Sequence, residues 1–122
     1  MFKDGPYSKH WALYVERPFP DEEESFICHV TGSAGNFQYE DKNNHARTSN
    51  RIYKLYFLGH ISESDLDNLR NVCRSLLVNN GDATWNCQNF VWDAFGALVE
   101  AGLLRPAQGV DKRTIWDQMD GV

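Results

Sequence analysis

The sequence predicts an α+β fold built on an antiparallel sheet, because strand-like segments fill the first half of the chain and helical patterns fill the second. Of its 122 residues, 42% are apolar and 24% are charged, which is typical of a globular protein with one hydrophobic core. A chain of this length is too short for two such cores. We therefore expect a single domain over residues 1–122.

Aromatic and β-branched residues predict four strands, at residues 9–15, 25–31, 37–40 and 51–61. The polar segment 16–24 lies between the first two strands and predicts a hairpin connection whose acidic run is solvated. The sequence GSAGN at 32–36 predicts a turn into the third strand, and the polar residues 41–50 predict a loop before the fourth.

Three helices are expected after the last strand. Residues 62–65 offer N-caps to a helix whose apolar stripe reaches Leu77, and the sequence NNGD at 79–82 ends that helix. A second helix is expected from about Asn86 to Ala101, with Gly102 closing it. A short last helix is expected over residues 111–119, capped by Asp111.

Composition argues against several classes of function and location. The formal net charge is −5, whereas a nucleic-acid partner requires a concentrated surface of Lys and Arg. The apolar runs are too short to span a membrane, so no integral membrane segment is expected, and the first ten residues contain no apolar core of a secretory signal. The three cysteines, at 28, 73 and 87, form a poor disulfide framework. A cytoplasmic protein is therefore expected.

Cys87 has two interpretations. It shares a helical stripe with Phe90, Val91 and Ala94, which is typical of a small buried core residue. It also lies in the first helical turn, where free backbone N–H groups and the helix dipole lower a thiol pKa and could stabilise an oxyanion. The sequence alone leaves both interpretations open.

A thiol nucleophile needs a base, and the chain has four histidines. His45 lies in a polar loop and His60 lies at a strand end, so neither has an implied partner. His10 and His29 lie inside predicted strands. If Val15 pairs near Glu24, the same register brings His10 opposite His29. The alternative is that both are half-buried histidines of the sheet.

Neither a metal nor another cofactor is expected. The cysteines and histidines lack the closely spaced pairs of a structural zinc site, and GSAGN is not followed by a helix, as a phosphate-binding loop would be. Cys28 alternates with His29, and Cys73 lies on the apolar stripe of its helix. We therefore expect both to be inert structural thiols.

The segments HWALYV (10–15), HV (29–30) and NCQNFV (86–91) together resemble motifs of the circularly permuted papain-like (NlpC-type) enzymes. These include the lecithin:retinol acyltransferase-like proteins and the small phospholipase A/acyltransferases. The resemblance implies an antiparallel sheet packed against the nucleophile helix. It also implies Cys87 as nucleophile, His10 as base and His29 as third member of a triad, with Asn86, Gln88 and Tyr14 as oxyanion or supporting residues.

The resemblance implies a cysteine-dependent hydrolase or acyltransferase acting on an ester, thioester or amide carbonyl of a small acyl-bearing or peptide-like substrate. Gln88-Asn89 stands where those lipid enzymes have Glu-His. The same scaffold also resembles the PPPDE-type isopeptidases, whose nucleophile lies in an Asn-Cys-Asn context. A non-catalytic binding or interaction domain on this scaffold is the remaining alternative.

Overall fold

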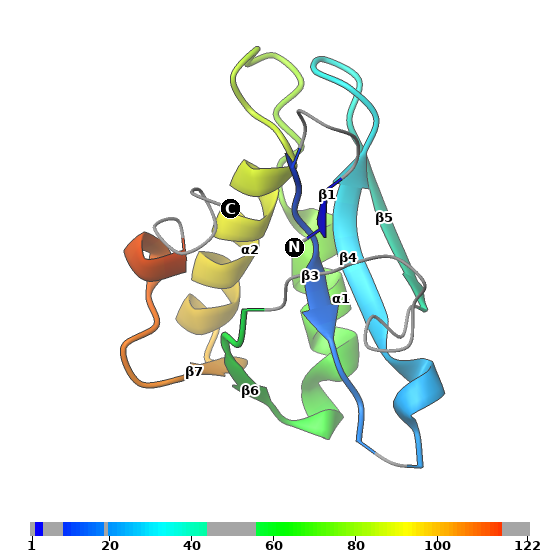
Figure 1. Ribbon diagram of the computed structural model, residues 1–122, viewed down its shortest axis with the longest axis vertical. Helices are drawn as coiled ribbons and strands as arrows, with labels where there is room; N and C mark the ends of the chain where they lie inside the picture. The colour runs from blue at the N-terminus through cyan, green and yellow to red at the C-terminus, as the bar shows by residue number, and fades with distance from the viewer. Residues whose placement is uncertain (1, 4–8, 19, 44–55, 116–122) are drawn as a thin grey trace. The chain divides into compact units, whose positions relative to one another are not determined.

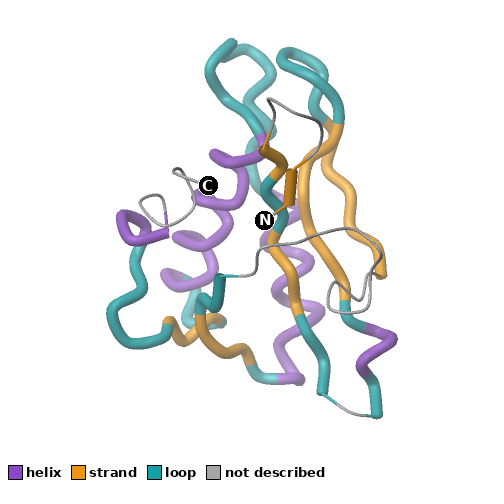
Figure 2. Tube along the Cα trace, in the orientation of Figure 1, coloured by secondary structure: helices purple, strands orange, loops and turns teal. Residues whose placement is uncertain are grey.

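The computed structural model describes residues 2–3, 9–18, 20–43 and 56–115. The chain divides into two compact units. The first comprises residues 1–54 and 78–91, and the second comprises residues 55–77 and 92–122. Strands and helices are both present, and the described strand pairs are all antiparallel, so the expected α+β class is confirmed (Figures 1 and 2).

The first unit contains a three-stranded sheet in the order β3-β4-β5 (Figure 1). Its strands are β3 (Leu13–Val15), β4 (Phe26–Thr31) and β5 (Gln38–Asn43). The strand expected at 25–31 is confirmed as β4, and the one expected at 37–40 is longer because β5 reaches Asn43. Five consecutive residues of β4 are buried, and β4 is the central strand of this sheet.

The single strand expected over residues 9–15 is instead two strands. Lys9–His10 forms β2, which pairs with β1 (Phe2–Lys3) in a separate two-stranded sheet, and β3 starts only at Leu13. Trp11 and Ala12 lie between them outside any strand. The alternating pattern of the sequence continues through this break and so gave no sign of it. Alternation predicts extended backbone, but it does not predict the strand with which each residue pairs.

The expected register of the first hairpin is wrong by two residues. Val15 pairs with Phe26 rather than lying near Glu24, and His10 pairs with Phe2 rather than lying opposite His29. The connection between β3 and β4 is longer than a plain hairpin tip, because residues Glu22–Glu24 form the short 3-10 helix η1. The pairing therefore starts two residues later in the chain than expected, at Phe26, the first residue of β4.

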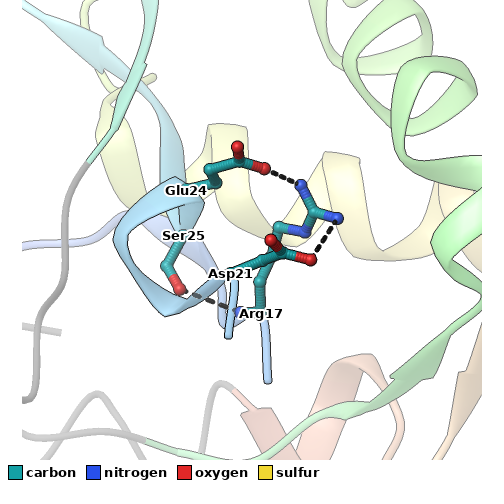
Figure 3. A network of polar contacts seen from close by, with 4 residues as sticks. All are labelled: Arg17, Asp21, Glu24 and Ser25. Carbon is teal, nitrogen blue, oxygen red and sulfur yellow. Dashed lines mark hydrogen bonds and ion pairs between the residues drawn. The ribbon is translucent and has the colours of Figure 1, made fainter. Parts of the chain in front are cut away.

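Arg17 fixes this connection through contacts with three residues (Figure 3). Its guanidinium forms ion pairs with Asp21, at 3.6 Å, and with Glu24, and its backbone N–H donates to Ser25 Oγ at 2.8 Å. The acidic run is therefore only partly a solvated tip. Two of its carboxylates neutralise a half-buried arginine at the end of the sheet.

The second unit contains the two-stranded sheet of β6 (Gly59–Ile61) and β7 (Leu104–Pro106), the 3-10 helix η3 (Glu63–Asp65) and α1 (Leu66–Ser75). Part of the strand expected at 51–61 lies outside the described residues, and β7 was not expected. Gly59 is required at this pairing, because a Cβ there would lie 2.2 Å from the carbonyl oxygen of Arg105.

Helix α1 is shorter than its sequence pattern. It ends at Ser75, so Leu77 lies beyond it and is 75% exposed, although it continues the predicted apolar stripe. Leu69 and Cys73 are the residues that the helix buries. The helix expected from Asn86 is confirmed as α2 (Cys87–Glu100), whose first residues belong to the first unit and whose remainder belongs to the second.

Residues 112–115 are helical, and Asp111 caps them as expected, since its carboxylate accepts the Thr114 N–H at 2.8 Å. The rest of the segment expected to be helical lies outside the described residues. Lys112 joins this turn to α2 in two ways. Its carbonyl accepts the Trp92 indole N–H at 2.9 Å, and its ammonium lies 4.3 Å from the centre of the same indole ring.

Candidate active site

Helix α2 begins with a reciprocal pair of asparagine caps. The Asn86 side-chain oxygen accepts the Gln88 backbone N–H, and the Asn89 side-chain oxygen accepts the Asn86 backbone N–H, both at 2.9 Å. The arrangement resembles a capping box, but Asn89 replaces the usual Glu or Gln at the third helical position, and the Asn86 oxygen accepts the second helical N–H rather than the third. Both asparagines therefore fix the turn that carries Cys87.

The segment before Cys87 is held by side chain–backbone contacts within the same unit. The Asn80 carboxamide accepts the Phe37 N–H at 2.7 Å and donates to the Phe37 carbonyl at 3.0 Å, so it pairs with that residue as a neighbouring strand would. Asp82 accepts from both the N–H and the hydroxyl of Thr84. Buried Trp85 then meets the rings of Phe37 and Phe90 edge-on.

The Cys87 thiol lies against the backbone of the residue that follows His10. The Trp11 N–H donates to Cys87 Sγ at 3.5 Å, although the two residues are 76 positions apart in the chain. Trp11 precedes β3, which is an edge strand of the described three-stranded sheet. A backbone N–H in this position is not used by a strand ladder, and here the sulfur accepts it.

Burial raises the pKa of the Cys87 thiol above its ordinary value, while the backbone N–H groups of Trp11, Cys87 and Gln88 lower it by smaller amounts. Of the two interpretations of Cys87, the burial and the raised pKa fit a core residue. The first-turn N–H groups act in the expected sense, but only 9% of the residue is exposed and desolvation outweighs them. The thiol is the resting form, so it needs a base to become a nucleophile.

His10 lies in β2, next to the residue that contacts the thiol. Its side chain lies outside the described part of the structure. The β3–β4 pairing ends at Leu13, and the backbone of His10 pairs with Phe2 instead of with β4.

His29 is buried on β4 and pairs with Glu40 on β5. Its Nε2 lies 3.0 Å from Glu40 Oε1, and Lys42 Nζ lies 3.4 Å from the same oxygen. The hydrogen bond to His29 is the largest reason why the pKa of Glu40 is below its ordinary value. Sequence reasoning missed Glu40. The predicted strands at 25–31 and 37–40 contained the signal, since a hairpin closed by the turn at 32–36 places these two residues opposite each other.

The other expected supporting residues are placed less directly. The Tyr14 hydroxyl donates to Glu16 at 3.5 Å, at the end of β3 away from His10. Gln88 contributes its backbone N–H to the cap and to the environment of the thiol.

His60 is exposed on β6, with its ring 5.2 Å from that of Phe57, and belongs to the second unit. His45 lies outside the described residues.

The three cysteines are all buried, and none of them forms a disulfide. Cys28 and Cys73 are fully buried. Cys28 is the residue before His29 on β4, so the side chains of Cys28 and His29 lie on opposite faces of the strand.

In the described ranges, no three His, Cys, Asp or Glu side chains are grouped as metal ligands. Over those same residues, no helix has both the length and the apolar character to cross a membrane.

No curated protein and no solved structure is significantly similar to this chain. A family model does match it, over residues 1–105. This range contains the capped helix start, the Trp11–Cys87 contact and the His29–Glu40 pair. The chain therefore belongs to DUF6540, a family of unknown function.

Proposed function

We propose that this protein is a cysteine-dependent hydrolase or acyltransferase of the permuted papain-like type, in which Cys87 attacks an ester, thioester or amide carbonyl. The observation that carries the proposal is the 3.5 Å contact between the Trp11 N–H and Cys87 Sγ. It brings the HWALYV segment to the NCQNFV segment, and these are the two motifs that the resemblance assigns to the base and the nucleophile.

The proposed reaction starts from a neutral thiol, because burial raises the pKa of Cys87. His10 accepts the thiol proton as Sγ bonds to the carbonyl carbon. Backbone N–H groups of the first turn of α2 stabilise the resulting oxyanion. The bond to the leaving group then breaks, His10 returns the proton to that group, and an acyl-thioester remains on Cys87.

Water or an acceptor hydroxyl or amine completes the cycle. His10 removes a proton from this second nucleophile as it attacks the thioester carbonyl, and the proton returns to the departing Cys87 sulfur. His29 acts through His10 by accepting a ring N–H, as the third member of a triad does. An amine as the leaving group would make the same chemistry an isopeptidase reaction.

The buried state of the thiol favours one competing function, that of a non-catalytic binding domain on the same scaffold. A cysteine that is 9% exposed and whose pKa is raised has the properties of a core residue. The two functions differ in whether an acyl group is ever transferred to Cys87.

The test is covalent trapping with a panel of activated esters, thioesters, lipids and ubiquitin-like probes, followed by peptide mass spectrometry. We expect an acyl adduct on Cys87 in the wild type and none in Cys87→Ser. Cys28→Ser is the matched control, because it removes another buried thiol of the same unit and should leave the adduct unchanged. If the wild-type protein forms no Cys87 adduct with any probe, the binding domain is the better account.

A further inference from the structure

The contact between buried His29 and partly exposed Glu40 determines the direction of a hydrogen bond at the proposed site. An ionised carboxylate can only accept hydrogen bonds. Because the pKa of Glu40 is below its ordinary value, its side chain is ionised at neutral pH. His29 Nε2, at 3.0 Å from Glu40 Oε1, must therefore be the donor of this bond.

A neutral imidazole carries one N–H and one acceptor nitrogen. When Nε2 holds the hydrogen, Nδ1 of His29 is left as the acceptor. A third member of a triad must offer such an acceptor to the ring N–H of the base, since it orients the base and stabilises its protonated form. A histidine of the opposite tautomer would offer a donor at that nitrogen instead.

We propose that Glu40 is a positioning residue, which fixes His29 in the Nε2–H tautomer and so makes His29 Nδ1 the acceptor for His10. The inference rests on the proposed function. It adds to the proposed site a positioning residue, Glu40, that the resemblance does not imply. Two features of the pair fit this role. The His29 side chain is only 6% exposed, so water competes little for its nitrogens, and β4 and β5 hold the two residues directly opposite each other.

Lys42 offers a matched control. It lies on the same strand and contacts the same carboxylate oxygen at 3.4 Å, but its side chain is 56% exposed. Lys42→Met removes the ion pair and leaves the bond from His29 to Glu40 in place. A contribution of Glu40 through general charge balance would be altered by both substitutions, whereas a contribution through the His29 tautomer would be altered by Glu40→Ala alone.

The direct test is nitrogen-15 NMR of the histidine rings in the folded protein, which distinguishes the two neutral tautomers by their ring nitrogen shifts. We expect His29 as Nε2–H in the wild type and in Lys42→Met, and a loss of this preference in Glu40→Ala. An Nδ1–H tautomer in the wild type, or an unchanged Nε2–H tautomer in Glu40→Ala, would overturn the inference without bearing on Cys87.

The kinetic test is the rate of Cys87 acylation by the best probe of the panel, measured against pH. We expect Glu40→Ala to lower this rate about tenfold. The double variant Glu40→Ala/His29→Phe should be no slower than His29→Phe alone, because Glu40 affects the reaction only through His29. A rate equal to that of the wild type in Glu40→Ala would contradict the positioning role. A wild-type Cys87 that is never acylated would instead overturn the proposed function, and the tautomer measurement would still decide whether Glu40 orients His29.

Discussion

Serine in place of Cys87 separates the two interpretations of this residue. A hydroxyl is far harder to ionise than a thiol, so we expect Cys87→Ser to abolish turnover. Its oxygen can accept the Trp11 N–H that the sulfur accepts now, so the free energy of unfolding should change by less than about 1 kcal/mol. Chemical denaturation measures the stability. A larger loss in a protein whose thiol never reacted would show that Cys87 is only a core residue.

Individual residues could be singled out as candidates from the sequence where their chemistry is rare, and not where it depends on a partner. Cys87 and His29 stood out as a thiol at a helix start and a histidine within a strand. Glu40 is one of many acidic residues in the chain, and it becomes distinctive only when the β4–β5 register sets it against a buried imidazole. The sequence left the direction of the thiol pKa shift open, because burial is a tertiary property that helical position does not report.

At the scale of elements, the start of α2 depends on its asparagine caps. We expect Asn86→Ala to lower the free energy of unfolding by about 1 kcal/mol, because the Gln88 N–H loses its acceptor. Asn89→Ala should cost a similar amount, and the double variant should cost less than the sum, since the two caps act on one turn. Gln88→Ala is the control, because it removes only the Gln88 side chain and leaves the backbone N–H that Asn86 caps. Equal stability of Asn86→Ala and Gln88→Ala in urea denaturation would contradict the capping role.

Elements with a strong periodic pattern were predicted, and those defined by pairing were not. The α2 pattern and its asparagine start gave the helix to within a residue at each end. The alternating segment 9–15 gave extended backbone, but not the break at Trp11 and Ala12 or the pairing of His10 with Phe2. Strand β7 contains Pro106 and only three residues, so it carries almost no local signal and is defined by β6.

At the scale of the whole molecule, Glu40 links stability to acid pH. Its folded pKa is below the ordinary value of 4.5, so its contribution to stability is complete above that value and is lost as the pH falls through the folded pKa. Glu40→Gln should therefore be less stable than the wild type at about pH 6, and this difference should shrink by about pH 3. Urea midpoints at the two pH values measure it. A difference that is the same at both values would show that the charge of Glu40 does not contribute.

Composition and the order of strands before helices were enough to predict the α+β class. The division into two units was not predicted, because each unit is assembled from two separate parts of the chain. The register error in the first hairpin came from η1, whose ordered residues lengthen the connection beyond what its polar composition indicates.

The central claim is that His10 activates Cys87, and the rate of Cys87 alkylation by iodoacetamide in the folded protein tests it most directly. Mass spectrometry of the labelled peptides follows all three cysteines at once across a range of pH. We expect Cys87 to react faster than Cys28 and Cys73 at about pH 7 in the wild type, because only Cys87 has a base beside it. We expect His10→Ala to slow the Cys87 reaction at that pH by at least about tenfold. A Cys87 that reacts no faster than Cys28, or at the same rate with and without His10, would contradict the account.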